Sequence, residues 1–284
     1  MPDYGHPLTF GTFVTPASSP VWAALQNAQL SERVGYDLVT FQDHPYQPSF
    51  HDTLALLGWV AANTSTIHVA ANVFNLPLRG QPAVLALAAA SLDILSGGRF
   101  EMGLGAGHFW DAIESAGGRR LTPGQGVDAL SEAVDIIRGM WDATARSPLH
   151  LAGQYYSVTG LQRGPSPAHH IPIWIGAMKP RMLRLVGTKA DGWLPSFANF
   201  GPGELEAGNA SIDVAAVDVG REPRDVRRLL NVPELPVNQV VDLVLDNGID
   251  TFILASDDPT TLRRFATDTI PEVRVQVAAQ RLGA

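Results

Sequence analysis

The sequence contains no cysteine among its 284 residues, which excludes disulfide bonds, thiolate metal sites and a cysteine nucleophile. Basic residues are also few, with 20 Lys and Arg against 28 Asp and Glu, for a formal net charge of −8. Proteins that bind nucleic acids or anionic membranes normally carry a concentrated basic surface. We therefore expect neither kind of partner.

Long hydrophobic runs are missing as well. The longest apolar stretch, Pro82 to Leu95, is interrupted by Ser91 and Asp93 and is too short to span a bilayer. Met1 to Thr15 lacks the basic segment followed by an apolar stretch that is typical of a secretory signal. We expect a cytoplasmic protein that does not contact a membrane.

Clusters of metal ligands are not found in the sequence. His169 and His170 are adjacent, so their side chains diverge, and they precede a predicted strand. No His-x-x-x-His pair, acidic cluster, Gly-x-Ser-x-Gly elbow or Walker loop occurs. We expect no bound metal.

The sequence does contain a repeated alternation of short apolar, β-branched runs and longer helical segments. Expected strands are Leu8–Val14, Asp37–Gln42, Ile67–Val73, Arg99–Leu104, Ile171–Gly176, Asp191–Leu194, Arg228–Val232 and Thr251–Ala255. Expected helices are Pro20–Val34, Thr53–Thr64, Pro82–Leu95, Pro123–Trp141, Pro180–Lys189, Glu204–Val219, Pro236–Asn247 and Thr260–Ala279. Several helices begin at proline and several end at glycine, as is typical of helix termini.

The strands are mostly apolar along their length instead of alternating, which indicates parallel strands that are buried on both faces. The first four begin about 30 residues apart, the length of a βα unit. Eight such units form a closed barrel or a doubly wound sheet, and their number and the chain length favour a (β/α)8 TIM barrel. We expect residues 1–284 to form one domain, with a short hairpin inserted between the fourth helix and the fifth strand, within Ala145–His170.

Active-site residues of such a barrel lie at the C-terminal ends of its strands. The second strand ends at Asp43-His44, and a histidine beside a carboxylate can exchange protons near neutral pH. A surface turn is the alternative interpretation. The third strand ends at Asn72-Val73-Phe74, where a backbone bulge could support a planar ring, although an ordinary apolar loop is also consistent with these residues.

The fourth strand carries glycines at 103, 105 and 107, followed by His108. Their spacing does not fit the dinucleotide-binding fingerprint, which needs a third glycine three residues after the second. It does allow the backbone to approach a ligand closely. Glu114, further along, is either a helix-capping acid or a catalytic one.

Small residues follow the fifth strand and lead into a helix. The free N–H groups and the dipole at a helix N-terminus favour an anion, so Gly176, Ala177 and Met178 form a candidate phosphate site. Ser196, after the sixth strand, could add a hydroxyl. The phosphate site common in barrels follows strands seven and eight instead.

Two segments together resemble a known family. Gly98–Gly107, with Glu114 downstream, resembles the fourth-strand signature of luciferase-like monooxygenases. Ile171–Arg184 followed by Ala190–Trp193 resembles the fifth and sixth units of that family. The resemblance covers most of the chain and implies an oxidoreductase.

Asp43-His44 resembles the branch of this family that uses the deazaflavin coenzyme F420. The resemblance implies that His44 handles a proton near the reactive ring carbon, with Asp43 orienting it, and that the Asn72–Val73 peptide bond is cis. The cofactor-binding residues that it implies are Asn72, Val73, Phe74, Gly107, His108, Gly176, Ala177, Met178 and Ser196.

The chain also departs from the family pattern. Trp110 stands where F420-dependent sugar-phosphate dehydrogenases carry an acid, and Phe109 beside it favours an apolar or planar small-molecule substrate. The resemblance further implies a homodimer. An FMN-dependent monooxygenase on the same fold and a non-catalytic flavin-binding barrel are the alternatives.

Overall fold

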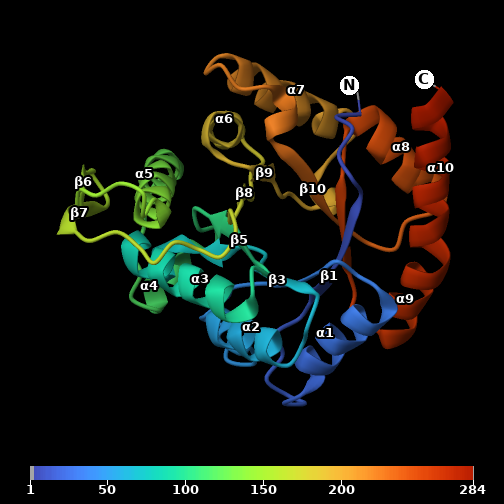
Figure 1. Ribbon diagram of the computed structural model, residues 1–284, viewed down its shortest axis with the longest axis horizontal. Coiled ribbons are helices and arrows are strands. Elements are labelled where there is room, and N and C mark those ends of the chain that lie inside the picture. Colours follow the sequence, from blue (N-terminus) through green and yellow to red (C-terminus); the bar gives the residue numbers. More distant parts are fainter. Residues whose placement is uncertain (1–2, 284) are drawn as a thin grey trace.

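The computed structural model, which describes residues 3–283, is a closed barrel of parallel strands (Figure 1). The barrel strands are β1 (Thr9–Val14), β2 (Leu38–Phe41), β3 (His68–Ala71), β5 (Phe100–Gly105), β8 (Ile173–Ile175), β9 (Gly192–Trp193), β10 (Arg227–Val232) and β11 (Thr251–Ala255). Parallel pairing of β3 with β5 and of β1 with β11 completes the ring. The predicted TIM barrel is confirmed, and each predicted strand is present.

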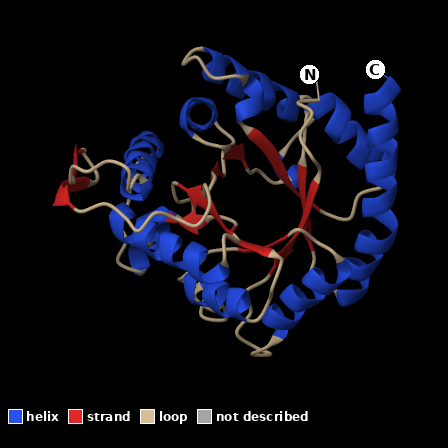
Figure 2. Ribbon diagram, in the orientation of Figure 1, coloured by secondary structure: helices blue, strands red, loops and turns tan. Residues whose placement is uncertain are grey.

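Helices surround the strands on all sides (Figure 2). They are α1 (Ala23–Val34), α2 (Thr53–Ala62), α3 (Pro82–Ser96), α4 (Trp110–Ser115), α5 (Pro123–Trp141), α6 (Pro180–Lys189), α7 (Glu204–Val217), α8 (Val237–Asn247), α9 (Pro259–Arg264) and α10 (Ile270–Gly283). Short 3-10 turns are η1 (Leu76–Leu78), η2 (Phe197–Asn199) and η3 (Pro223–Asp225). None of the helices among the described residues has the length and hydropathy needed to cross a membrane.

Two details of the helices differ from the prediction. The last predicted helix is divided by a π-helical turn, η4 (Phe265–Thr269), into α9 and α10. The short helix α4 was not predicted, because six residues are too few to establish a helical period.

The predicted insertion is an antiparallel hairpin of β6 (Leu149–Ala152) and β7 (Ser157–Leu161), which lies outside α5 in Figure 1. The Glu132 carboxylate of α5 accepts hydrogen bonds from the backbone N–H groups of Gln154, Tyr155 and Tyr156 at 2.8–2.9 Å. This carboxylate fastens the hairpin turn to the helix.

The third strand is interrupted where the sequence predicted a bulge. β3 ends at Ala71, the Asn72–Val73 bond is cis as expected, and pairing with β5 resumes in β4 (Phe74–Asn75). A Cβ atom on Gly105 would lie 2.7 Å from Val73 Cγ2, so the bulge and β5 come together only because this position is glycine.

The barrel interior has its own small core, separate from the larger core between strands and helices. It contains Leu38, Ala70, Trp174, Leu194, Leu229 and Ile253. Side chains alternate along a strand, so the residue two positions further along also points inward. This rule places Thr40, Asn72 and Asn231 above the apolar layer, toward the C-terminal ends of the strands.

Candidate active site

Two adjoining cavities open at the C-terminal ends of the strands. The larger one, of about 830 Å³, lies between the loops after β4 and β5 and the start of α5 and α6. The smaller one, of about 230 Å³, lies over the centre of the barrel. His44, Val73 and Met178 line both, so the cavities meet beside the histidine.

His44 is half-buried at this junction. Its Nδ1 lies 3.2 Å from the Tyr46 hydroxyl oxygen, and its ring centroid is 5.4 Å from that of Phe109. Burial lowers the pKa of His44 below the ordinary histidine value, and the nearby charge of Asp43 opposes this effect. At neutral pH the imidazole is therefore uncharged. Tyr46 occupies Nδ1, which leaves Nε2 for a ligand.

The hydrogen-bond partners of Asp43 differ from the one that the sequence led us to expect. Within residues 3–283 it makes no hydrogen bond to His44, because its oxygens are bonded to the Arg79 guanidinium and to the backbone N–H of Asn75 at 2.9 Å. Arg79 also forms an ion pair with Asp52 at 2.7 Å. Asp43 is thus a buried anchor that joins the loop after β2 to the segment after β4.

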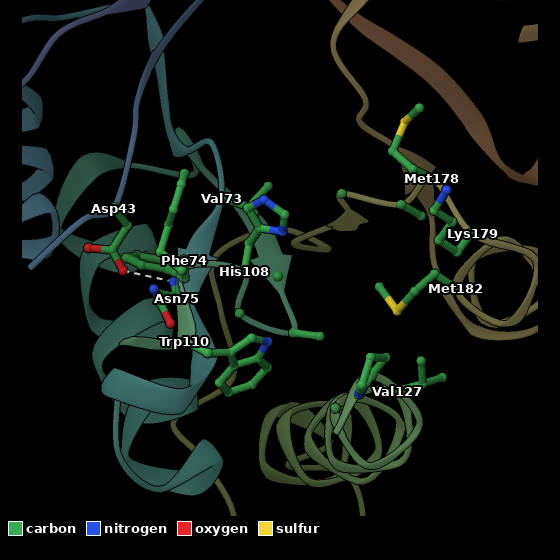
Figure 3. A pocket seen from close by; sticks show the side chains of 18 of the residues that line it. Asp43, Val73, Phe74, Asn75, His108, Trp110, Val127, Met178, Lys179 and Met182 are labelled. Carbon is green, nitrogen blue, oxygen red and sulfur yellow. Dashed lines mark hydrogen bonds between the residues drawn. The ribbon is translucent and has the colours of Figure 1, made fainter. Parts of the chain in front are cut away.

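The bulge residues form one wall of the larger cavity. In Figure 3, Phe74 and Asn75 lie opposite Met178 and Met182, with His108 and Trp110 between the two sides. Most of these side chains are apolar, and the space between them suits a planar ring system. The residues Asn72, Val73, Phe74, Gly107 and His108, all predicted to bind a cofactor, line this cavity.

The end of the cavity nearest α6 is suited to an anion. Gly176, Ala177 and Met178 lead into the helix, whose first residue is Pro180, so free backbone N–H groups and the helix dipole face this end. Lys179 and Arg181 add positive charge to the lining. The structure therefore brings the predicted phosphate residues after β8 together at one end of the larger cavity.

Ser196 and Glu114 lie elsewhere. Ser196 lines the smaller cavity and not the larger one, and its Oγ lies 3.2 Å from the Asn231 amide nitrogen. Glu114 is on α4 and forms an exposed ion pair with Arg120 at 2.6 Å, without lining either cavity. The N-cap residue of α4 is Phe109, so Glu114 is not the capping acid that was one of its two expected roles.

Several residues of the site were missed by the sequence reasoning. Tyr46, Gln42 and Asn231 contribute polar groups beside His44, and Arg79 neutralises Asp43. Asn231 could have been predicted from the sequence, because it is a polar residue at an inward position of a predicted apolar strand. The role of Arg79 depends on a contact across 36 positions of sequence, which no local pattern indicates.

His169 lies at the opposite, N-terminal end of the barrel, as its position before β8 indicates. Its Nδ1 is 2.8 Å from Asp93 Oδ1 and its Nε2 is 3.7 Å from Glu101 Oε1. These two carboxylates, Glu101 foremost, raise the pKa of His169 above the ordinary value. In the part of the chain that the structure describes, no group of three or more His, Asp or Glu side chains is arranged to hold a metal ion.

Comparison with known proteins identifies the family of the chain. The family model described as luciferase-like monooxygenase matches residues 7–234. The chain belongs to this family. Among its relatives in the family, a 5,10-methylenetetrahydromethanopterin reductase of Methanolobus tindarius is 31% identical over 221 residues, which are 77% of this chain and 63% of that protein. An F420-dependent glucose-6-phosphate dehydrogenase of Microbacterium testaceum is 28% identical over 80% of this chain and 68% of its own length.

Solved structures support the fold of this luciferase-like chain. An F420-dependent secondary alcohol dehydrogenase, in complex with an F420–acetone adduct, superposes with a TM-score of 0.82 over 95% of this chain and 100% of that chain, at 18% identity. At that identity the likeness establishes the barrel architecture alone.

Proposed function

We propose that the protein is a coenzyme F420-dependent oxidoreductase that transfers a hydride between the deazaflavin and a small organic substrate. The observation that carries this proposal is the position of His44, which lines both a coenzyme-sized cavity and a smaller one and whose Nδ1 is bonded to Tyr46. One of the relatives named above, the glucose-6-phosphate dehydrogenase, supports the choice of coenzyme, because it is named for F420.

The residues of the larger cavity fit a deazaflavin. The bulge at Val73 offers a backing for the ring, and the space above it is kept clear by Gly105 and Gly107. The start of α6 with Lys179 fits the phosphate group. When bound, a deazaflavin exchanges a hydride at the ring carbon that replaces the reactive nitrogen of a flavin.

His44 is suited to move the proton that accompanies the hydride. Burial favours the neutral imidazole at pH 7, so Nε2 can accept a proton from the substrate, and the imidazolium that forms returns it in the reverse reaction. The Tyr46 hydroxyl oxygen can accept from Nδ1–H, which favours the tautomer whose Nε2 lone pair is available to the substrate. The apolar wall of Phe109 and Trp110 limits the access of water to this proton.

Replacement of His44 tests the assignment. In His44→Ala, we expect the rate of coenzyme reduction to fall by about 10²–10⁴-fold, which is the usual contribution of a general acid or base. Coenzyme affinity, measured by fluorescence titration, stays within about twofold because the bulge at Val73 and the start of α6, which are proposed to hold the ring and the phosphate, are unchanged. His170→Ala is the matched control, since that side chain is 81% exposed at the other end of the barrel. A His44→Ala enzyme that binds F420 and reacts at the wild-type rate would refute the assignment of His44 as the proton-transferring residue.

We further propose that the chain forms a homodimer through α2 and α3. The only charged residue on these helices is Asp93, which is buried, whereas large apolar side chains on their outer faces are exposed. Trp59, Leu87 and Leu95 are 51%, 47% and 85% exposed, and Trp22 stacks on Trp59. A helix that is apolar on all sides is normally covered.

The occupant that fits this uncharged face is a second copy of the same face. Stable dimers bury about 800 Å² on each partner. The apolar side chains that α2 and α3 offer to such an interface are all 44% to 85% exposed: Trp59, Val84, Leu87, Ile94 and Leu95. We expect light scattering to give twice the chain mass for the wild type and the monomer mass for Leu95→Glu. A wild-type monomer at micromolar concentration contradicts this second proposal and leaves the first untouched.

A further inference from the structure

The smaller cavity differs in chemistry from the larger one. None of the described residues that line it is Asp, Glu, Lys or Arg, whereas Asp43, Lys179 and Arg181 line the larger cavity. Its only titratable side chain is His44, whose pKa is lowered by burial. At neutral pH the lining of the smaller cavity therefore carries no ionised side chain.

The polar groups of the smaller cavity come from inward positions of four strands. Gln42 comes directly after β2. Leu38 and Thr40 point into the barrel, and Gln42, two positions after Thr40, is expected to do the same. Asn72 and Asn231 exchange two hydrogen bonds across the cavity floor at 2.6 and 3.2 Å, which fixes both carboxamides. Ser196 lies beside Asn231 on the neighbouring strand.

Some of these groups remain free for a ligand. The Ser196 oxygen accepts from the Asn231 amide at 3.2 Å, so its own O–H can donate to a bound molecule. The Gln42 side chain makes no hydrogen bond to the part of the chain that is described, so its carboxamide can both donate and accept. Phe13, Leu194 and Met178 complete the lining with apolar surface.

We propose that the smaller cavity is the substrate site and that it selects an uncharged, hydrogen-bonding small molecule, an alcohol or a carbonyl compound, through Gln42 and Ser196. This rests on the F420-dependent function proposed above. The volume of about 230 Å³ holds on the order of eight non-hydrogen atoms at about 30 Å³ each. A carboxylate or phosphate would lose its hydration here without gaining a counter-charge, so anionic substrates are rejected.

A matched pair of probes tests the charge selection. Butan-2-one and 2-oxobutanoate differ by the replacement of one methyl group with a carboxylate. We expect the wild type loaded with F420 to bind butan-2-one at least tenfold more tightly, as measured by saturation-transfer NMR titration. Tighter binding of 2-oxobutanoate, or no binding of either probe to the F420-loaded protein, overturns the proposal.

Gln42→Lys brings a positive charge into the cavity and should reverse the preference in favour of 2-oxobutanoate. Gln280→Lys, on the exposed face of α10, makes the same change in net charge at a distance and should leave the preference unchanged. Equal shifts in both variants would show that the effect is one of overall charge and contradict the proposal.

A milder variant guards against a folding defect in Gln42→Lys. Ser196→Ala removes only a hydroxyl, and we expect it to weaken butan-2-one binding by about three- to tenfold. Unchanged butan-2-one affinity in this variant argues against the site. F420 titration of each sample separates the two proposals. A wild type that binds butan-2-one in the smaller cavity but does not bind F420 would refute the proposed coenzyme. The proposed substrate site would still be supported.

Discussion

The buried ion pair of Arg79 and Asp43 gives a sharp prediction about stability. The Arg79 side chain is 11% exposed and that of Asp43 is 0% exposed. In Arg79→Met, Asp43 would keep a single hydrogen bond, from the Asn75 backbone, and no counter-charge. Removing one partner of a buried pair costs about 3–5 kcal/mol, because the remaining charge stays buried and uncompensated.

The second partner of Arg79 supplies an internal control. Asp52 is 49% exposed, and a pair at that exposure contributes about 1 kcal/mol or less. In Asp52→Asn the side chain can still cap α2 through its bond to the Ala55 N–H, so the cap is preserved. We therefore expect Asp52→Asn to lose at most about 1 kcal/mol.

Urea denaturation at pH 7 measures both losses. At roughly 2–4 °C per kcal/mol for a chain of this size, Arg79→Met should also melt about 10 °C below the wild type. The double variant Arg79→Met, Asp43→Asn removes the stranded charge and should recover part of the loss. The reasoning is refuted if Arg79→Met costs no more than Asp52→Asn, or if the double variant is less stable than Arg79→Met alone.

Three further predictions concern titration and packing. Because burial lowers the pKa of His44, the kcat/KM of alcohol oxidation should fall on the acid side through a pKa below the ordinary value of about 6.5, and a midpoint above that value contradicts this. The pKa of His169 is raised in the folded state, so its contribution to stability is complete below about pH 6.5 and is lost as the pH rises through the raised pKa. Urea midpoints of His169→Gln between pH 6 and 9 should therefore decline less with pH than those of the wild type, and parallel curves contradict the assignment. Gly103→Ala should lose about 1–3 kcal/mol, because its Cβ would collide with the Ala71 carbonyl oxygen, whereas Gly58→Ala on α2 meets no atom within 4 Å and should not destabilise.

Much of the fold could be predicted from the sequence because its signals are local. Apolar, β-branched runs mark the strands, and Pro82, Pro123 and Pro180 mark the first residues of α3, α5 and α6. The π-helical turn at Phe265–Thr269 has no such signal, since its residues continue an ordinary helical pattern. The cis bond between Asn72 and Val73 was expected only through the family resemblance.

The part of the candidate site that lies directly after the barrel strands could be predicted from the sequence, because active-site residues of a barrel follow the C-terminal ends of its strands. That rule located His44, the bulge at Val73 and the turn at Met178, and all three line the cavities. Asp43 and Ser196 line a cavity as well, but their hydrogen-bond partners, Arg79 and Asn231, could not be predicted because they are distant in sequence. Contacts of this kind follow from the closed barrel and not from local sequence.

The identity of the coenzyme is the central claim, and a binding titration tests it most directly. Protein freed of small molecules is titrated with F420 and, separately, with FMN, and the fluorescence of each coenzyme is followed. We predict saturable binding of F420 at one site per chain, with an affinity at least tenfold higher than that for FMN. Tighter binding of FMN, or no saturable binding of F420, would contradict the account.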